Sequence, residues 1–123
     1  IDFDVPTDSV ELSMDVVNSI PLKFITRVWA LDSEGYPIYW LDATSDDYTI
    51  ASGTQDSPVT TNMTWKISTE RNHVKFSGIR ILCNAFAASE EHLGVPLNKE
   101  QKIELRNLTL HLPDGITIDP DAL

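Results

Sequence analysis

The stretch VELSMDV, residues 10–16, decides the fold, because apolar and polar side chains alternate through it one by one. Successive side chains of a β-strand point to opposite faces of a sheet, so a period of two predicts a strand with one buried face and one solvent-facing face. The same alternation returns in VTTNMTWKI, residues 59–67. We therefore expect an all-β domain.

Turn residues divide the chain into about seven predicted strands. Asn18-Ser19-Ile20-Pro21 ends the first strand. Asp32-Ser33-Glu34-Gly35 predicts a hairpin, because Asp can begin such a turn and Gly35 can adopt the positive φ of a bulged loop. No amphipathic segment of helical length separates the strands, which argues against an α/β fold. The predicted strands cover residues 10–17, 22–31, 36–41, 48–51, 59–67, 78–88 and 101–112.

The last predicted strand changes phase in its middle. Apolar residues fall on odd positions up to Leu105 and on even positions from Leu108 onwards. One extra residue, at Arg106 or Asn107, would swap the buried face, which is what a β-bulge does. Strands that bend or pass between two sheets often need this device.

Short strands at this spacing predict a two-sheet Ig-like β-sandwich of about seven strands with Greek-key connections, and an open barrel is the alternative. The length of 123 residues fits a single domain spanning residues 1–123, and 41% hydrophobic residues are enough for a core. The predicted core consists of Val10, Leu12, Met14, Val16, Val28, Met63, Trp65, Ile81, Cys83, Ile103, Leu105, Leu108 and Leu110.

The chain is acidic, with 9 Lys and Arg against 19 Asp and Glu and a net charge of −10. Such a charge repels phosphate backbones and anionic lipid surfaces, which argues against nucleic acid as a partner. The alternative explanation of this charge is that it only keeps the domain soluble. No stretch approaches the roughly 20 apolar residues of a membrane span, so no transmembrane segment is expected.

The sequence contains no recognisable catalytic or metal-binding motif. The single cysteine, Cys83, lies in an apolar predicted strand, where a thiol behaves as a small hydrophobic side chain. His73, His92 and His111 are far apart, and none has a partner at ligand spacing. No G-x-S-x-G elbow and no glycine-rich phosphate loop is present. We therefore expect a protein that is not an enzyme, with no catalytic residues, no metal and no cofactor.

Acidic residues gather in three predicted turns, at residues 32–34, 42–47 and 114–121. Calcium takes six to eight oxygen ligands from such loops, so a calcium site built from separate loops is an alternative. Asp is also common in turns because of its local hydrogen bonds, and this second explanation requires no metal.

Aromatic residues around the predicted hairpin form the candidate ligand-binding site. Exposed rings beside Asp and Asn suit the apolar face and the hydroxyls of a sugar, and they equally suit a protein interface. Neighbouring residues of a regular strand point to opposite faces, so one of Tyr39 and Trp40 is expected to be exposed. The alternative is that Trp40 and Trp65 belong to the core and the tyrosines pack at edges. The candidate residues are Trp29, Tyr36, Tyr39, Trp40 and Tyr48.

Two longer stretches carry a family resemblance. Residues 10–38, VELSMDVVNSIPLKFITRVWALDSEGYPI, combine a strand, an N-x-I-P-L turn, a second strand and a D-x-E-G hairpin. Residues 103–119, IELRNLTLHLPDGITID, combine a long strand with a P-D-G-I turn. Together they resemble β-sandwich domains of uncharacterised secreted or lipid-anchored surface proteins of Bacteroides-type gut bacteria. The resemblance implies an extracellular or cell-surface location, an outer-membrane anchor outside this chain, no cofactor and no catalytic residues.

The expected function is that of a non-catalytic structural or binding module of a bacterial cell-surface protein. The alternative is a carbohydrate-binding module that uses the aromatic residues near Tyr36 to Tyr48. The expected partner is a glycan or another surface protein.

Overall fold

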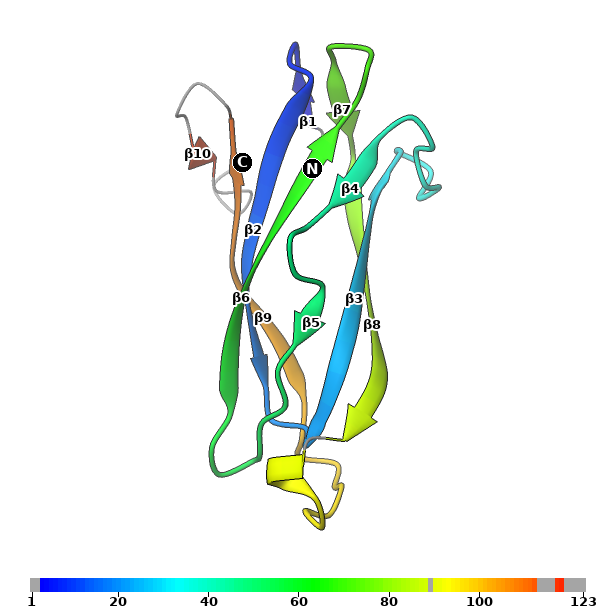
Figure 1. Cartoon of the computed structure of the whole chain (residues 1–123). Coiled ribbons are helices and arrows are strands. Elements are labelled where there is room, and N and C mark those ends of the chain that lie inside the picture. Colours follow the sequence, from blue (N-terminus) through cyan, green and yellow to red (C-terminus); the bar gives the residue numbers. More distant parts are fainter. Residues whose placement is uncertain (1–2, 89, 113–116, 119–123) are drawn as a thin grey trace.

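The computed structural model describes residues 3–88, 90–112 and 117–118, the last two by their backbone alone. Within these ranges the chain forms short and long β-strands and one 3-10 helix, shown in Figure 1. The long strands are β2 (Ser9–Asn18), β3 (Leu22–Leu31), β6 (Val59–Ser68), β8 (Gly78–Ala88) and β9 (Ile103–His111). The short elements are β1 (Phe3–Val5), β4 (Asp42–Thr44), β5 (Thr49–Ile50), β7 (Val74–Phe76), η1 (Glu90–His92) and β10 (Thr117–Ile118).

The described strands pair antiparallel into a five-stranded sheet in the order β10-β9-β2-β6-β4, a three-stranded sheet in the order β5-β3-β8, and the small pair β1-β7. Buried side chains from the two larger sheets belong to one hydrophobic cluster, so these sheets face each other across a shared core (Figure 1). The all-β fold with packed antiparallel sheets is therefore confirmed. The Ig-like form with Greek-key connections stays a prediction.

β2 follows the predicted alternation closely because it lies between β6 and β9. Its apolar residues at positions 10, 12, 14 and 16 are at most 1% exposed. Leu12 lies opposite Trp65 and Met14 opposite Met63 of β6. Burying an apolar side chain of this size contributes about 1.5–3 kcal/mol, so this strand is a main source of core stability.

The predicted bulge is present in β9. Ser13 lies opposite Thr109 and Asp15 opposite Arg106, so β9 uses one residue more than β2 over this interval. Asn107, inside the interval, has a φ of 55°, a left-handed conformation that Asn tolerates better than most residues. The extra residue allows apolar side chains on both sides of the bulge to face the core.

Asp15 connects this bulge to its neighbours on the outer face of the five-stranded sheet. Its carboxylate accepts a hydrogen bond from Asn107 Nδ2 at 2.8 Å and another from Asn62 Nδ2 of β6 at 2.9 Å. These two hydrogen bonds, that from Asn107 first, lower the pKa of the Asp15 carboxyl group because they stabilise its charged form.

One predicted strand, residues 36–41, is wrong. Pairing with β3 begins as expected, since the Ile38 N–H donates to the carbonyl of Ala30 at 2.9 Å. Pro37 next to it forms an isolated antiparallel bridge with Leu31. The Leu41 N–H then donates back to the Ile38 carbonyl at 3.3 Å, so the chain turns over residues 39–40. The short strand β4 follows this turn and forms an edge of the five-stranded sheet.

The predicted core is confirmed except at one position. Ile81, Cys83, Ile103 and Leu108 are partly buried against the cluster, and the other predicted members apart from Leu105 are buried. Leu105 is 47% exposed. It lies opposite the buried Val16 and thus on the inner face, but in the described residues β10 covers β9 only at residues 110–111. A side chain at an uncovered sheet edge keeps its contact with solvent.

A buried polar side chain, Asn18, organises the corner after β2. Its Nδ2 donates to the carbonyls of Leu22 at 3.1 Å and Ala51 at 2.9 Å, and its Oδ1 accepts from the Ile20 N–H at 2.9 Å. Gly53 approaches so closely that a Cβ there would lie 2.0 Å from the Asn18 carbonyl oxygen. The corner therefore requires an amide side chain at position 18 and glycine, which has no side chain, at position 53.

Candidate functional site

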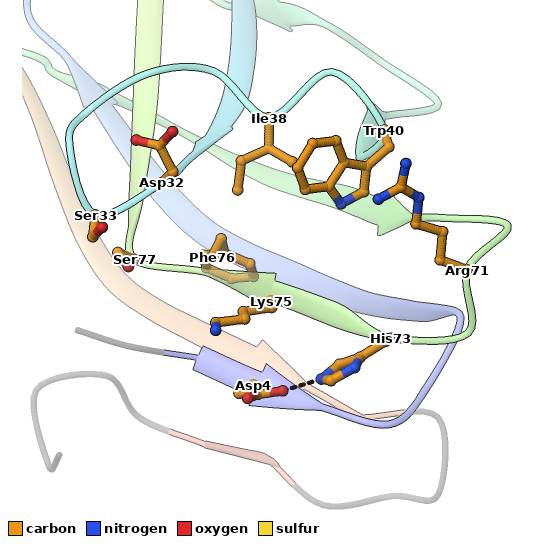
Figure 2. Close-up of a pocket in the computed structure, with 10 residues that line it drawn as sticks. All are labelled: Asp4, Asp32, Ser33, Ile38, Trp40, Arg71, His73, Lys75, Phe76 and Ser77. Carbon is orange, nitrogen blue, oxygen red and sulfur yellow. Dashed lines mark hydrogen bonds and ion pairs between the residues drawn. The ribbon is translucent and has the colours of Figure 1, made fainter.

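The candidate site is a hollow of about 740 Å³ formed where β1, β7 and the loop 32–41 meet, shown in Figure 2. We call it the loop-end hollow. The loop contributes Asp32 and Trp40, and the turn before β7 contributes Arg71 and His73. The site therefore depends on segments that lie far apart in the sequence. The pairing of β1 with β7 and that of β4 with β6 bring them together.

Trp40 and Arg71 form one wall of the loop-end hollow, and Tyr39 packs against Trp40. The rings of Tyr39 and Trp40 meet edge to face, with centroids 4.9 Å apart and an interplanar angle of 88°. The guanidinium carbon of Arg71 lies 4.4 Å from the centroid of the Trp40 ring, a cation–π contact that Figure 2 shows beside the hollow. Tyr39 is 84% exposed and Trp40 is 40% exposed. Both rings reach solvent because they lie in a turn rather than in the regular strand that the sequence predicts.

Charged groups line the rest of the hollow. His73 Nε2 contacts Asp4 Oδ1, and Figure 2 shows this contact. Asp4 lies opposite Lys75 in the β1–β7 pair. The Asp32 carboxylate accepts hydrogen bonds from two N–H groups of its own hairpin, at 2.9 Å and 3.0 Å. The hollow thus places cationic donors, Arg71 and Lys75, and acidic acceptors, Asp4 and Asp32, around the exposed ring of Trp40.

The five aromatic residues predicted as a ligand site do not share one surface. Trp40 lines the loop-end hollow, and Tyr39 contacts the Trp40 ring. Trp29 and Tyr48 line a separate depression of about 240 Å³. Tyr48 packs edge-on against Trp65, with centroids 5.1 Å apart. Tyr36 is exposed in the hairpin and is not among the residues that line either space.

The charged residues beside Trp40 are not among those that the sequence pattern predicts. Arg71 and His73 flank Asn72, which has a φ of 52° and marks a tight turn. A polar turn of this kind predicts exposure, but no spacing rule connects it to Asp4 or to Trp40. Only the pairing of strands places these side chains together.

The remaining reactive groups lie elsewhere. His92 Nδ1 is 2.9 Å from Ser52 Oγ, at η1. Cys83 is half-buried, and burial raises the pKa of its thiol, which disfavours the reactive thiolate. Across the described ranges 3–88 and 90–112, no three His, Cys, Asp or Glu side chains gather as a metal site requires. The acidic side chains predicted at the turn of residues 114–121 lie outside the described residues.

Comparison of the chain with protein-family models, with curated proteins and with solved structures finds no match. The resemblance to surface proteins of Bacteroides-type bacteria therefore stays a prediction. The part of the chain that the structure describes contains no helix long and apolar enough to span a membrane.

Proposed function

We propose that this domain is a non-catalytic binding module of a bacterial cell-surface protein and that it holds a saccharide in the loop-end hollow. The observation that carries the proposal is the wall of Trp40, backed by Tyr39, and Arg71, which faces charged hydrogen-bonding groups across a space of about 740 Å³. A sugar ring presents an apolar face of C–H groups and an edge of hydroxyls. An exposed aromatic ring meets the first of these, and mixed donors and acceptors meet the second.

The Asp4–His73 contact is the arrangement in this hollow that bears on catalysis, because a histidine beside a carboxylate can act as a general base. Its position favours a structural role. Asp4 belongs to β1 and His73 precedes β7, and the same two strands are joined by the stacked rings of Phe3 and Phe76, 5.0 Å apart. We infer that the pair fastens β1 to β7 and leaves a bound saccharide intact.

The test begins with a glycan-array screen of the wild-type domain, followed by calorimetric titration of the saccharide that binds best. Trp40→Ala is expected to weaken binding by about tenfold or more, because an aromatic anchor in a binding site commonly contributes that much. Tyr36→Ala is the matched control: it removes an exposed ring of the same loop that does not line the hollow. This control is expected to bind as the wild type does.

Two results would overturn the proposal. The first is an absence of binding across a broad array, or binding that Trp40→Ala leaves unchanged in a folded protein. The second is breakdown of the bound saccharide by the wild type that His73→Gln abolishes, which would make the Asp4–His73 pair catalytic. Chromatography of the saccharide after prolonged incubation distinguishes binding from breakdown.

A further inference from the structure

β8 is a long strand with an unpaired edge. It pairs with β3 on one side, and within the described residues no strand pairs with its other side over Gly78–Ala88. Such an edge presents free N–H and C=O groups and is a ready template for another strand. Proteins usually protect long edges with prolines or several charges, but β8 contains no proline and only one charged residue, Arg80.

The side of the sandwich next to this edge is apolar and open. Phe86 of β8 is 56% exposed and Leu105 on the neighbouring edge of β9 is 47% exposed, and Leu82 adds an apolar side chain, 41% exposed, on the outer face of β8. An apolar cavity of about 200 Å³ lies between the start of β8 and the end of β9, where Ile79 and Leu108 line it. Apolar side chains along a free edge favour a partner that covers them.

β1 shows what kind of strand this side accepts. β7 precedes β8 with a single residue between them, and β1 pairs antiparallel with β7. Phe3 of β1 lines the cavity between β8 and β9, so β1 lies on the open side. The three residues of β1 alternate apolar, acidic and apolar, and the acidic one, Asp4, lies opposite Lys75.

The charge of the three-stranded sheet is opposite to that of the whole chain. β3, β5 and β8 contain no Asp or Glu, although the chain has a net charge of −10. The same strands carry Lys23, Arg27 and Arg80, which are three of the nine Lys and Arg residues. All three side chains are exposed. Arg27 lies opposite Leu82 and therefore shares its outward face.

We propose that the free edge of β8 is a docking site for an extended strand of a partner protein in which apolar residues alternate with acidic ones. The strand adds antiparallel to β8 in line with β1, so backbone hydrogen bonds supply affinity and alternate side chains supply specificity. Its apolar residues cover the opening between β8 and β9, and its acidic residues lie on the outer face beside Arg80, one strand away from Arg27. A second copy that pairs through its own β8 does not satisfy the edge, because that strand brings Arg80 and no acid.

The test uses two synthetic peptides of the length of β8, one alternating Val and Glu and one alternating Val and Lys. Each is titrated into the ¹⁵N-labelled domain. The Glu peptide is expected to shift amide resonances along residues 78–88 and to bind about tenfold more tightly than the Lys peptide, since charge complementarity contributes chiefly to such discrimination. Shifts confined to other residues, or equal binding of the two peptides, would overturn the proposal.

Charge reversal gives a second, independent measurement. The double variant Arg27→Glu/Arg80→Glu changes two exposed side chains and is expected to prefer the Lys peptide. Lys66→Glu is the matched control, because Lys66 is exposed on the outer face of the five-stranded sheet. It makes the same type of change away from β8 and is expected to retain the wild-type preference. A double variant that folds and still prefers the Glu peptide contradicts the proposal, and so does self-association of the domain through β8.

Discussion

β2 and β8 have nearly the same length, 10 and 11 residues, and opposite burial. In β2 every second residue is buried, whereas in β8 none is fully buried and the last five residues are exposed. β2 has a strand on each side and a second sheet above it. Among the strands that the structure describes, β8 has a neighbour on one side only. The comparison shows that neighbours, more than the composition of a strand, decide how much of its apolar surface leaves water.

The largest expected difference comes from truncating one leucine in each strand. Leu12→Ala removes a fully buried side chain of β2 and should lower the free energy of unfolding by about 3–4 kcal/mol, because it also leaves a cavity. Leu82→Ala removes a side chain that is largely open to solvent and should cost less than about 1 kcal/mol. Urea unfolding of both variants measures the difference. Equal losses would show that β8 is buried in solution, for example by association.

An asparagine in each strand provides a second, smaller contrast. Asn18→Ala leaves the carbonyls of Leu22 and Ala51 and the N–H of Ile20 without their partner and should cost about 2–3 kcal/mol. Asn84→Ala, on the exposed face of β8, should change the free energy of unfolding by less than about 0.5 kcal/mol. Thermal and urea unfolding should agree on this order. A stable Asn18→Ala variant would mean that water replaces the amide at that corner.

The smallest expected effect concerns the solvent-facing side of β2. Hydrogen bonds from Asn107 and Asn62 lower the pKa of Asp15 in the folded state. The stability that this carboxylate contributes is therefore complete above its unfolded-state pKa and is lost as the pH falls through the lower, folded-state value. The wild type should be more stable than Asp15→Asn near neutral pH, and the two urea midpoints should converge in acid.

Glu11→Gln is the control for that experiment, because it removes one negative charge from the same exposed face of β2. A pH profile of Glu11→Gln that matches that of Asp15→Asn would attribute the effect to net charge and not to the hydrogen bonds at the bulge.

The same dependence on neighbours explains which features could be predicted from the sequence. β2, β6 and the bulge at Asn107 were predictable because alternation and its change of phase are local. The exposure of Leu105 was not, since it depends on how far β10 extends along β9. The strand expected over residues 36–41 pairs with β3 only around Pro37 and Ile38 and then turns, so its apolar residues do not continue the ladder.

The candidate site was predictable only in part, for a related reason. Trp40 and Tyr39 could be proposed from their type and their place near a turn. Asp4, Arg71 and His73 could not. The pairing of residues 3–5 with residues 74–76 brings Asp4 to His73, and the pairing of residues 42–44 with residues 66–68 brings Arg71 near Trp40. Contacts between residues this far apart in the chain produce no periodic pattern in the sequence.

The position of β2 also bears on the synthesis of the protein. Its two neighbours, β6 and β9, are made long after it, and its first residues await partners near His111. Pairing over such distances closes large loops and places the domain among slow folders, with times of milliseconds to seconds. At about 5–20 residues per second, a ribosome needs roughly 5–20 s to make the intervening chain. During that interval the strand that later forms the centre of the sheet emerges with its apolar residues uncovered, so a nascent-chain chaperone would find its most attractive target in the first strand of the future core.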